Sequence, residues 1–430
     1  MSAKRQTQRT IQVCAHWQGM AEPVSMGTLY AAPSRGKEIF SFEYDAAWLK
    51  SPYALMLDPD LGLFSGPQYA RDGHDNFGLF LDSSPDRWGR MLMKRREAQQ
   101  AKTEGRDARP LMESDYLLGV YDGHRMGALR FRLSDDGPFL DNRTDMAAPP
   151  WAKLRDLEYA SLQLEREDAE SQSDYMLWLN MLIAPGGSLG GARPKAGVLD
   201  ETGHPWIAKF PSRRDEMNIG KWEYLVCQLA QAAGVETARS QIRNFSGEYD
   251  TFLTRRFDRT DVGERIHFAS AMTLLGKKDG DGADSGVSYL DLADFLIKHG
   301  AQTNKDLEQL WRRIVFFICV SNTDDHLRNH GFLLHERGWV LAPAYDMNPV
   351  ATGGGLSLNI SRDDNSASLD LARSVASTFR IGEKRREEII AEVTGAVRHW
   401  QERAKQLGLP ASETAIMKHS FREAEKNTGN

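Results

Sequence analysis

Short apolar segments separated by Gly, Pro and Asp predict a β-rich beginning of the chain. Between residues 11 and 81 the apolar runs are brief, and in residues 39–44 apolar and polar side chains alternate. Such alternation is typical of a strand with one buried face. Ser84 and Pro85 then have the residue types that favour an N-cap and a first helical position. A helix is therefore predicted to begin there, and the charged residues 97–113 are predicted to form an exposed connection.

The middle of the chain alternates between strand-like and helix-like patterns. Residues rich in Gly and Pro separate these segments, as expected for turns and linkers. The predicted helices are 151–167, 175–183 and an amphipathic segment that carries Glu223 and ends at Gly234. The predicted strands are 117–120, 128–133, 206–210, 240–244 and 251–257.

After residue 260 helix-like patterns dominate. Ser288 and Thr303 each precede an Asp by three positions, which is the short form of a capping box, so each is predicted to begin a helix. The helix after Thr303 has an apolar stripe that leads into the apolar run 314–320. Apolar residues at steps of three and four in 383–407 predict one long helix that packs a single face.

The bulk composition is that of a soluble globular protein, with 41% hydrophobic and 27% charged residues among 430. This length allows two or three domains. The net charge of -6 gives no support for a broad nucleic-acid-binding face. The three scattered cysteines indicate neither a disulfide framework nor a zinc site. Because no apolar run is long enough for a signal peptide or a membrane span, the cytoplasm is the expected location.

A dense polar cluster directly follows the apolar run 314–320. Polar groups attached to a buried element are costly unless they have partners, such as substrate, a metal or a strong local network. Asp324 and Asn329 are separated by four residues, the spacing of a protein-kinase catalytic loop. A hairpin predicted between residues 331 and 341 would return the chain, so that Asp346 lies beside Asn329 and both bind one hard cation. Alternatively, Asp324 and Asn329 are ordinary turn and cap residues.

The segment 185–198, which reads PGGSLGGARPKAGV, is rich in glycine. Glycines let the backbone approach a phosphate closely and direct N–H groups at it, and Lys195 could add a positive charge. The segment matches neither of the standard phosphate-loop patterns, so a flexible hairpin turn is an alternative. Ser188 lies within it, and its hydroxyl could itself be phosphorylated.

Lys209 lies in a predicted strand, and Glu223 follows fourteen residues later in an amphipathic helix. A strand lysine paired with a helix glutamate is the arrangement that fixes a lysine on the ATP phosphates in kinases. The alternative is a lysine at a strand end that extends its ammonium group into water.

The Gly-rich segment, the strand lysine, the helix glutamate, the Asp–Asn pair and the later Asp follow one another along the chain in the order found in kinases. Their combination is more specific than any one of them. The segments GGSLGGARPKA, IAKFPS, RRFDR, SNTDDHLRNHGF and APAYDMNP resemble the HipA family of bacterial serine/threonine kinases, the toxin partners of HipB-type antitoxins. SPDRWGR is similar to the N-terminal part of that family. Because the resemblance covers roughly residues 10–400, we expect a full-length member.

The resemblance implies a role for each candidate residue. Asp324 matches the catalytic base, and Asn329 and Asp346 match the magnesium ligands. Asp325 stands where some members have Gly, and we expect Asp324 to be the base because it alone has the four-residue gap to Asn329. Ser188 matches the serine whose autophosphorylation silences the enzyme. The residues implied in nucleotide binding are Ser188, Gly190, Gly191, Ala192, Arg193, Lys195, Lys209, Glu223, Arg255, Phe257, His326 and Tyr345.

The fold that the resemblance implies is α+β and two-lobed, like a protein kinase, with a β-rich N-terminal part and a mainly α-helical C-terminal lobe. Its expected parts are a β-rich HipA-type module at 1–110, a kinase N-lobe with the Gly-rich loop and strand Lys at 111–258, and a helical C-lobe with the catalytic loop at 259–430.

The implied activity is the phosphorylation of a protein serine or threonine, with ATP and Mg²⁺ as cofactors and aminoacyl-tRNA synthetases as the family's best-known substrates. The expected partners are a HipB-like helix-turn-helix antitoxin and the protein substrate, with DNA reached through the antitoxin and no membrane. Two alternatives are a small-molecule kinase of the aminoglycoside or choline type and a non-catalytic co-repressor that assists an antitoxin.

Overall fold

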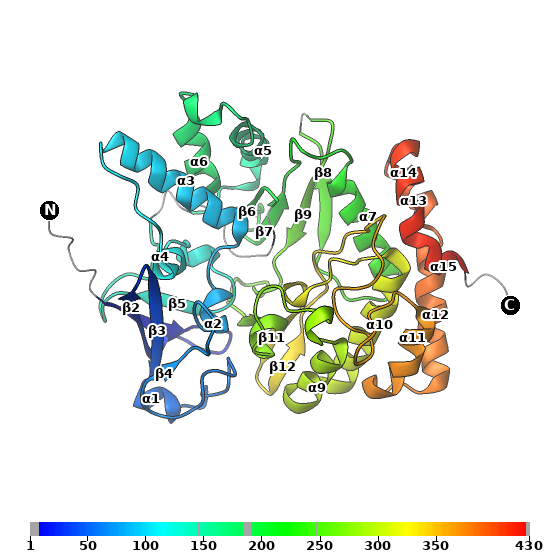
Figure 1. Ribbon diagram of the computed structural model, residues 1–430, viewed down its shortest axis with the longest axis horizontal. Helices are drawn as coiled ribbons and strands as arrows, with labels where there is room; N and C mark the ends of the chain where they lie inside the picture. Colours follow the sequence, from blue (N-terminus) through cyan, green and yellow to red (C-terminus); the bar gives the residue numbers. More distant parts are fainter. Residues whose placement is uncertain (1–7, 144–146, 184–190, 192, 246, 427–430) are drawn as a thin grey trace. The chain divides into compact units, whose positions relative to one another are not determined.

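The computed structural model describes residues 8–143, 147–183, 191, 193–245 and 247–426. The chain forms two compact units (Figure 1). The N-terminal unit comprises residues 1–208 and 258–269, and the C-terminal unit comprises residues 209–257 and 270–430. The chain therefore leaves the N-terminal unit after residue 208, returns to it for a short segment and leaves it again.

An antiparallel sheet of five strands, in the order β4-β3-β2-β1-β5, lies in the N-terminal unit (Figure 1). Side chains from one face of the sheet, such as Phe42 and Phe131, are buried against Phe80 at ring-centroid distances of 5.5 and 6.0 Å. The predicted β-rich beginning is thus confirmed. The elements are β1 (Arg9–Ala15), β2 (Val24–Ser34), β3 (Lys37–Tyr44), β4 (Gln68–Tyr69), β5 (Leu129–Arg132), α1 (Ala46–Leu49) and α2 (Gly78–Leu81).

Four longer helical elements and two strands complete this unit. Helix α6 packs against both α3 and α5, and the predicted helices at 151–167 and 175–183 correspond to α5 and α6. The elements are α3 (Arg87–Thr103), α4 (Glu113–Leu118), α5 (Leu154–Leu164), α6 (Tyr175–Ile183), β6 (Lys195–Leu199) and β7 (Pro205–Lys209), whose last residue belongs to the C-terminal unit.

The start of α3 differs from the sequence prediction. Helix α3 begins at Arg87, and Asp86 rather than Ser84 is its N-cap, because the Asp86 carboxylate accepts a hydrogen bond from Gly89 N at 2.8 Å. The Ser84 hydroxyl instead donates to Phe80 O at 2.9 Å, four residues back along the chain.

Two further predictions in this region are wrong. The expected connection 97–113 is helical as far as Thr103, where the ion pair of Glu97 with Arg106 at 2.6 Å supports the last turns of α3. The expected strand 117–120 is instead occupied by the end of α4. The Asp115 carboxylate accepts a hydrogen bond from Met112 N at 2.9 Å, and this cap favours a helix over an extended segment.

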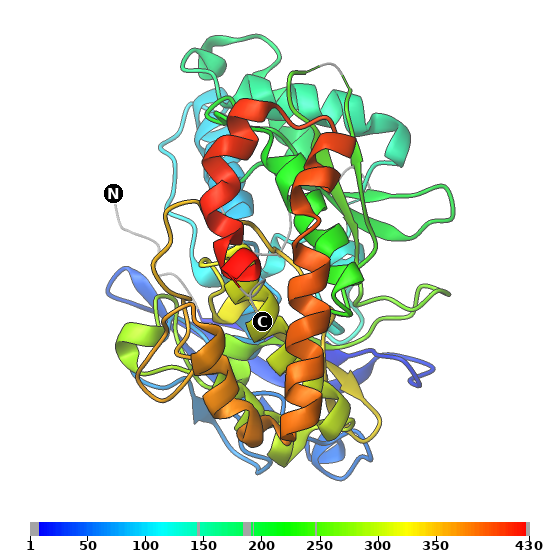
Figure 2. The same cartoon turned by 90° about the vertical axis from the view of Figure 1, so that its right-hand side faces the viewer.

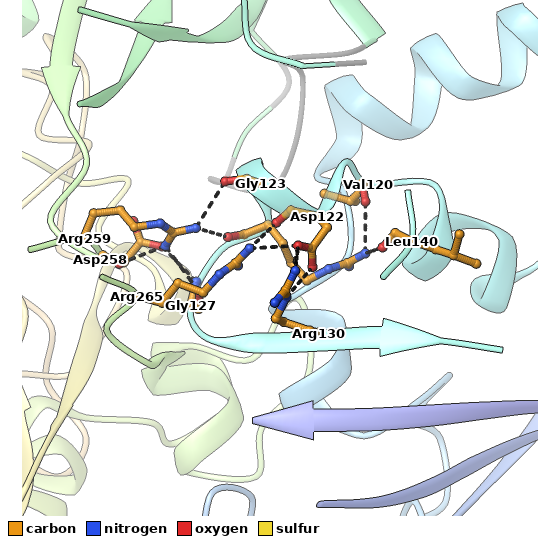
Figure 3. A network of polar contacts seen from close by, with 10 residues as sticks. Val120, Asp122, Gly123, Gly127, Arg130, Leu140, Asp258, Arg259 and Arg265 are labelled. Carbon is orange, nitrogen blue, oxygen red and sulfur yellow. Dashed lines mark hydrogen bonds and ion pairs between the residues drawn. The ribbon is translucent and has the colours of Figure 1, made fainter. Parts of the chain in front are cut away.

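A polar network attaches the segment 258–269 to the rest of the N-terminal unit (Figure 3). The buried Asp258 Oδ2 accepts hydrogen bonds from Gly127 N at 2.8 Å and Arg259 Nη1 at 2.7 Å. Arg265 Nη2 donates to the Asp122 carbonyl oxygen at 2.6 Å. The contact between Asp258 and Gly127 therefore joins residues 131 positions apart.

The C-terminal unit is mainly helical and packs around α10 (Thr303–Val320). All residues of α10 from Ile314 to Val320 are buried, and the helix contacts α9, α11, α12 and α15. In Figure 2 the orange α12 and the red α13, α14 and α15 face the viewer. The other helices are α7 (Ile219–Ala232), α8 (Ala271–Leu274), α9 (Tyr289–His299), α11 (Leu369–Val375), α12 (Glu383–Val397), α13 (Trp400–Gln406), α14 (Ala411–Met417) and α15 (Arg422–Lys426).

The strands of this region are short, and they belong to sheets with the strand orders β6-β7-β9-β8 and β10-β11-β12. The pairs β8–β9 and β11–β12 are both antiparallel, with Gln241 opposite Leu253 and Leu333 opposite Val340. The predicted hairpin after the polar cluster is thereby confirmed. The strands are β8 (Ser240–Arg243), β9 (Thr251–Arg255), β10 (Phe268–Ser270) at the boundary of the units, β11 (Gly331–His335) and β12 (Gly338–Leu341).

Two helix predictions in the C-terminal unit need correction, whereas the capping box at Ser288 is confirmed. Helix α10 has Gln302 rather than Thr303 as its N-cap, because the Thr303 hydroxyl donates to Leu296 O and Gly300 O at 3.2 Å. The predicted long helix at 383–407 is two helices, α12 and α13. The break lets Trp400 stack on Phe421 with a centroid distance of 4.3 Å.

The fold is α+β with a β-rich N-terminal region and a helical C-terminal region, as predicted. The division into parts at 1–110, 111–258 and 259–430 stays a prediction, because a division by contacts does not assign kinase lobes. Among the described helices, none combines the length and the apolar character that crossing a membrane requires.

Candidate active site

Lys209, the last residue of β7, lies between two carboxylates in the C-terminal unit. Its Nζ is 2.6 Å from Glu223 Oε1 on α7 and 2.6 Å from Asp346 Oδ1. The lysine side chain is 10% exposed and that of Glu223 is 3% exposed, so the ammonium does not extend into water. The structure thus brings together three of the residues that the sequence singled out, from three separate segments.

The electrostatics of this group keep Lys209 positively charged. Burial alone would lower the pKa of Lys209, but the negative charges of Asp346 and Glu223 raise it above its ordinary range. A lysine held by two carboxylates in a poorly solvated place is oriented as well as charged. It is therefore suited to contact an anionic ligand.

Asp346 has an unusual backbone. Its φ is +55°, in the left-handed region that few residues other than Gly adopt without cost. Neighbouring contacts hold it there: Asn348 N donates to Asn322 Oδ1 at 3.0 Å, and Asn348 Nδ2 approaches Asp346 Oδ1 at 3.5 Å. Such strained residues concentrate at functional sites, where the surrounding structure fixes them.

The loop after α10 presents one acid to solvent and buries the next. Asp324 is exposed, whereas Asp325 is 1% exposed and its carboxylate binds Tyr289 and His330. Asn329 Nδ2 donates to the Asp324 carbonyl oxygen at 2.9 Å, which ties the two ends of the loop together. Of the two neighbouring acids, Asp324 is thus the one that a substrate can reach.

Several buried polar atoms of this loop have no hydrogen-bond partner within the described part of the chain. In the loop they are His326 Nδ1, Asn329 Oδ1 and His330 Nδ1, and Asn348 Oδ1, after the hairpin, is a further such atom. Buried amide oxygens normally have a partner, so an unpartnered one is a candidate ligand for a cation. The described residues hold no group of three or more His, Cys, Asp or Glu that could bind a metal. Asn329 and Asp346 carry oxygen atoms that could hold a hard cation such as Mg²⁺, with the remaining ligands from phosphate or water.

A second group of predicted residues borders this loop. Phe257 contacts the ring of Tyr345 at a centroid distance of 5.4 Å, and the Tyr345 hydroxyl donates to Arg328 O at 2.7 Å. Arg255 is half-buried, and its backbone N–H donates to Arg239 O at 2.8 Å. Phe257 and Tyr345 offer aromatic faces of the kind on which a base can stack.

The described end of the Gly-rich segment belongs to the N-terminal unit. The buried Lys195 pairs with Asp86 at 2.7 Å and donates to Gly191 O at 3.2 Å. The Trp88 indole donates to Lys195 O at 3.0 Å. The charge of Lys195 is thus already balanced by the SPDRWGR segment, which the sequence did not predict. Arg193 is half-buried, and Ser188, Gly190 and Ala192 lie outside the described residues.

Sequence reasoning gave no specific role to four residues that shape the loop: Tyr289, Asn322, His330 and Asn348. The two asparagines lie inside or beside motifs that the sequence analysis quoted, so the density of polar residues could have found them. Tyr289 is 36 positions from Asp325 and looks like an ordinary apolar-face residue of α9, so no local pattern indicated it.

Part of the chain matches a known domain family and two named relatives. Residues 187–400 match the family model described as "HipA-like C-terminal domain". A Haemophilus influenzae protein named "Putative kinase" is 27% identical over 184 residues, which are 39% of this chain and 53% of that protein. "Putative kinase Y4dM" of Sinorhizobium fredii is 27% identical over 202 residues, 43% of this chain and 48% of that protein. The chain thus spans about half the length of the curated relatives it matches.

A solved structure has the same fold. It is described as "Shewanella oneidensis MR-1 Toxin Antitoxin System HipA, HipB and its operator DNA complex", and the matched chain gives a TM-score of 0.63 with 17% identity. The match covers 96% of this chain and 95% of the other, so the likeness includes both units. The two-lobed kinase-like fold class is thereby confirmed. These findings show that residues 187–400 are a HipA-like C-terminal domain, within a chain that is similar to the kinases named above and shares the fold of this solved structure.

Proposed function

We propose that this protein is an ATP-dependent serine/threonine protein kinase that acts as the toxin of a HipBA-type module. The observation that carries the proposal is the position of the Lys209 ammonium, 2.6 Å from both Glu223 and Asp346. In kinases a strand lysine paired with a helix glutamate contacts the ATP phosphates, and a nearby acid holds the metal. The HipA-like domain and the related kinases support the coarser statement that the chain is kinase-like, and the substrate class and the toxin role are our proposal.

Each residue of the site has a part in the proposed reaction. Asp324 orients the substrate hydroxyl and accepts its proton while the hydroxyl oxygen forms a bond to the γ-phosphorus. The bond from that phosphorus to the bridging oxygen breaks, and ADP leaves with the electron pair. Lys209 stabilises the phosphate charge, and Asn329 and Asp346 are the residues that would hold Mg²⁺. Bound Mg²⁺ neutralises charge that develops on the phosphates, so the protein contributes mainly position and electrostatics.

The proposed partners are a HipB-like helix-turn-helix antitoxin and a protein substrate, with DNA contacted through the antitoxin. The solved chain from Shewanella oneidensis is described in complex with HipB and operator DNA, which supports the antitoxin part. We further propose that Ser188 is autophosphorylated. A phosphate adds a charge of about -1.5 to -2, which opposes nucleotide binding in a loop that itself receives phosphates.

The test uses purified protein, Mg-ATP and a bacterial lysate whose own kinases have been inactivated. We expect phosphate on serine or threonine of a small set of lysate proteins and on Ser188, both absent with Asp324→Asn. Peptide mapping by mass spectrometry identifies the sites. Transfer to small alcohols but not to proteins would indicate a small-molecule kinase. ATP binding without any transfer would favour a co-repressor.

A further inference from the structure

A buried polar cluster includes two residues of the loop that carries Asp324. It consists of Tyr289 from α9, Asp325 and His330, which are 0%, 1% and 0% exposed. Asp325 Oδ2 accepts hydrogen bonds from the Tyr289 hydroxyl and from His330 Nε2, the latter at 2.8 Å. The rings of Tyr289 and His330 meet edge to face with centroids 5.6 Å apart. The Tyr289–Asp325–His330 cluster is thus compact, and its two hydrogen bonds fix the orientation of its side chains.

Two residues of the cluster are the sequence neighbours of Asp324 and Asn329, to which the proposed mechanism gives roles. Asp325 directly follows Asp324, and His330 directly follows Asn329. Between them a short helical turn (Leu327–Asn329) is closed by Asn329 N donating to His326 O at 2.8 Å. The hydrogen bond between Asp325 and His330 therefore closes a ring whose two ends each adjoin one proposed site residue. Tyr289 fixes this ring to α9.

Packing alone does not account for a charged group at this place. A buried carboxylate costs several kcal/mol of desolvation, and an apolar side chain of similar size would fill the same space without that cost. A hydrogen-bonded buried network, in contrast, orients its members, and here both hydrogen bonds converge on Asp325, while His330 Nδ1 has no partner among the described residues. Arg313 supplies an opposite charge nearby: burial lowers the pKa of Arg313 to about 10, and the charge of Asp325 opposes that shift.

We propose that the Tyr289–Asp325–His330 cluster is a positioning device that fixes the separation of Asp324 from Asn329, and so of the base from the metal ligand. The inference rests on the proposed kinase function. It assigns to Asp325 a structural task distinct from that of its neighbour Asp324. None of the three side chains touches substrate in this scheme, and each acts through the backbone of the loop.

The test compares Tyr289→Phe with the matched control Tyr44→Phe. Both hydroxyls are buried, but the Tyr44 hydroxyl has no partner within the described residues, so its loss removes no hydrogen bond. Mn²⁺ binding in the presence of a non-hydrolysable ATP analogue is followed by electron paramagnetic resonance, together with kcat, KM for ATP and the melting temperature. Asp325→Asn provides a second variant that retains the side-chain size.

We expect Tyr289→Phe to weaken Mn²⁺ binding and to lower kcat by about tenfold each, as is typical when a residue that orients a metal ligand is lost. Asp325→Asn should have a larger effect in the same direction, and Tyr44→Phe should match the wild type.

If both cluster variants melt earlier but keep wild-type Mn²⁺ affinity and kcat, the cluster is only structural and the proposal is overturned. A wild-type protein that binds Mn²⁺ and the ATP analogue but transfers no phosphate would instead overturn the proposed function, while Mn²⁺ affinity still tests the cluster. If the wild type binds neither, both proposals fail.

Discussion

At the scale of single residues, solvent exposure separates two neighbouring acids. Asp324 is exposed and Asp325 is buried and hydrogen-bonded, so their replacement should have different consequences. We predict that Asp324→Asn lowers phosphoryl transfer by about 10²–10⁴-fold, the usual contribution of a general base. Its free energy of unfolding should change by less than about 0.5 kcal/mol, as at other exposed positions. Asp363→Asn, which is exposed in the same unit, is the control and should alter neither quantity.

Kinase assays and urea unfolding on the same preparations check this prediction. A variant that keeps near-normal transfer would show that Asp324 is not the base.

Lys209 combines a proposed role with a structural one. Lys209→Ala should abolish transfer and also destabilise the fold by about 3–5 kcal/mol at pH 8, because it leaves two carboxylates facing each other without a cation. The raised pKa of Lys209 means that its charge stabilises the folded state at every pH below about 10 and is lost only above that range.

The pH dependence of the loss distinguishes the ion pair from simple packing. At pH 5 the orphaned carboxylates of the Lys209→Ala variant can take up a proton, so the destabilisation should be smaller than at pH 8. Lys209→Met, which keeps most of the volume, should show the same difference between the two values of pH. An equal loss at both values in urea titrations would mean that side-chain volume, rather than charge, is what the site needs.

The sequence could indicate site residues that lie close to one another along the chain. It indicated fewer of the contacts between residues that are far apart in the sequence. The gap between Asp324 and Asn329 is a local signal, because one loop holds both. The contact between Lys209 and Asp346 spans 137 positions and was reached only through kinase order and family resemblance. The contact of Tyr289 with Asp325 had no signal at all, because a buried tyrosine on an amphipathic helix has the pattern of any core residue.

At the scale of elements, α10 is the helix whose end presents the loop, and its first turn contains a buried acid. Asp306 is 3% exposed, and its Oδ2 accepts a hydrogen bond from Leu341 N at 3.2 Å. Burial raises the pKa of Asp306 to about 6, although the Leu341 N–H and the charge of Lys305 oppose the shift. The folded state therefore binds this proton more tightly than the unfolded chain does.

The sign of the resulting pH dependence follows from the difference in bound protons. Between about pH 4 and pH 6 the folded state holds more protons than the unfolded state, so stability falls as pH rises through this window. Asp306→Asn removes this cost and should be about 1–2 kcal/mol more stable than the wild type at pH 8, with the gain fading towards pH 4.5. Urea titrations at both values test this, and a variant that is less stable than the wild type at pH 8 would contradict it.

Helix and strand existence was predictable from apolar periodicity, but helix starts depended on which of several competing side chains caps the helix. Ser84, Asp86 and Thr303 all have residue types that cap well. The structure uses Asp86, whose carboxylate reaches Gly89 N, and gives Ser84 and Thr303 carbonyl partners earlier in the chain. The break between α12 and α13 was likewise invisible, because the apolar steps continue across it while Trp400 packs on Phe421.

At the scale of the whole molecule, the chain returns to its N-terminal unit after the first strands of the C-terminal unit. Periodicity could not predict this path, because the segment 258–269 is held by side-chain contacts to residues far earlier in the chain. From the sequence, the RRFDR segment showed only a resemblance to the HipA family. The structure shows that its last two residues bind backbone groups: Asp258 binds Gly127 N (Figure 3), and Arg259 donates to Arg125 O.

The returning segment therefore gives a prediction about how the N-terminal unit is held together. Asp258→Ala leaves the Gly127 N–H without its carboxylate and removes the ion pair of Asp258 with Arg259, both in a buried place. We expect a loss of about 3–5 kcal/mol in the free energy of unfolding, as for other buried pairs that lose one partner. Faster proteolytic cleavage within 258–269 should accompany it.

Val262→Ala, at an 82% exposed position of the same segment, is the control and should leave both unchanged. If Asp258→Ala unfolds and is cleaved like this control, the polar network of Figure 3 does not hold the segment in place.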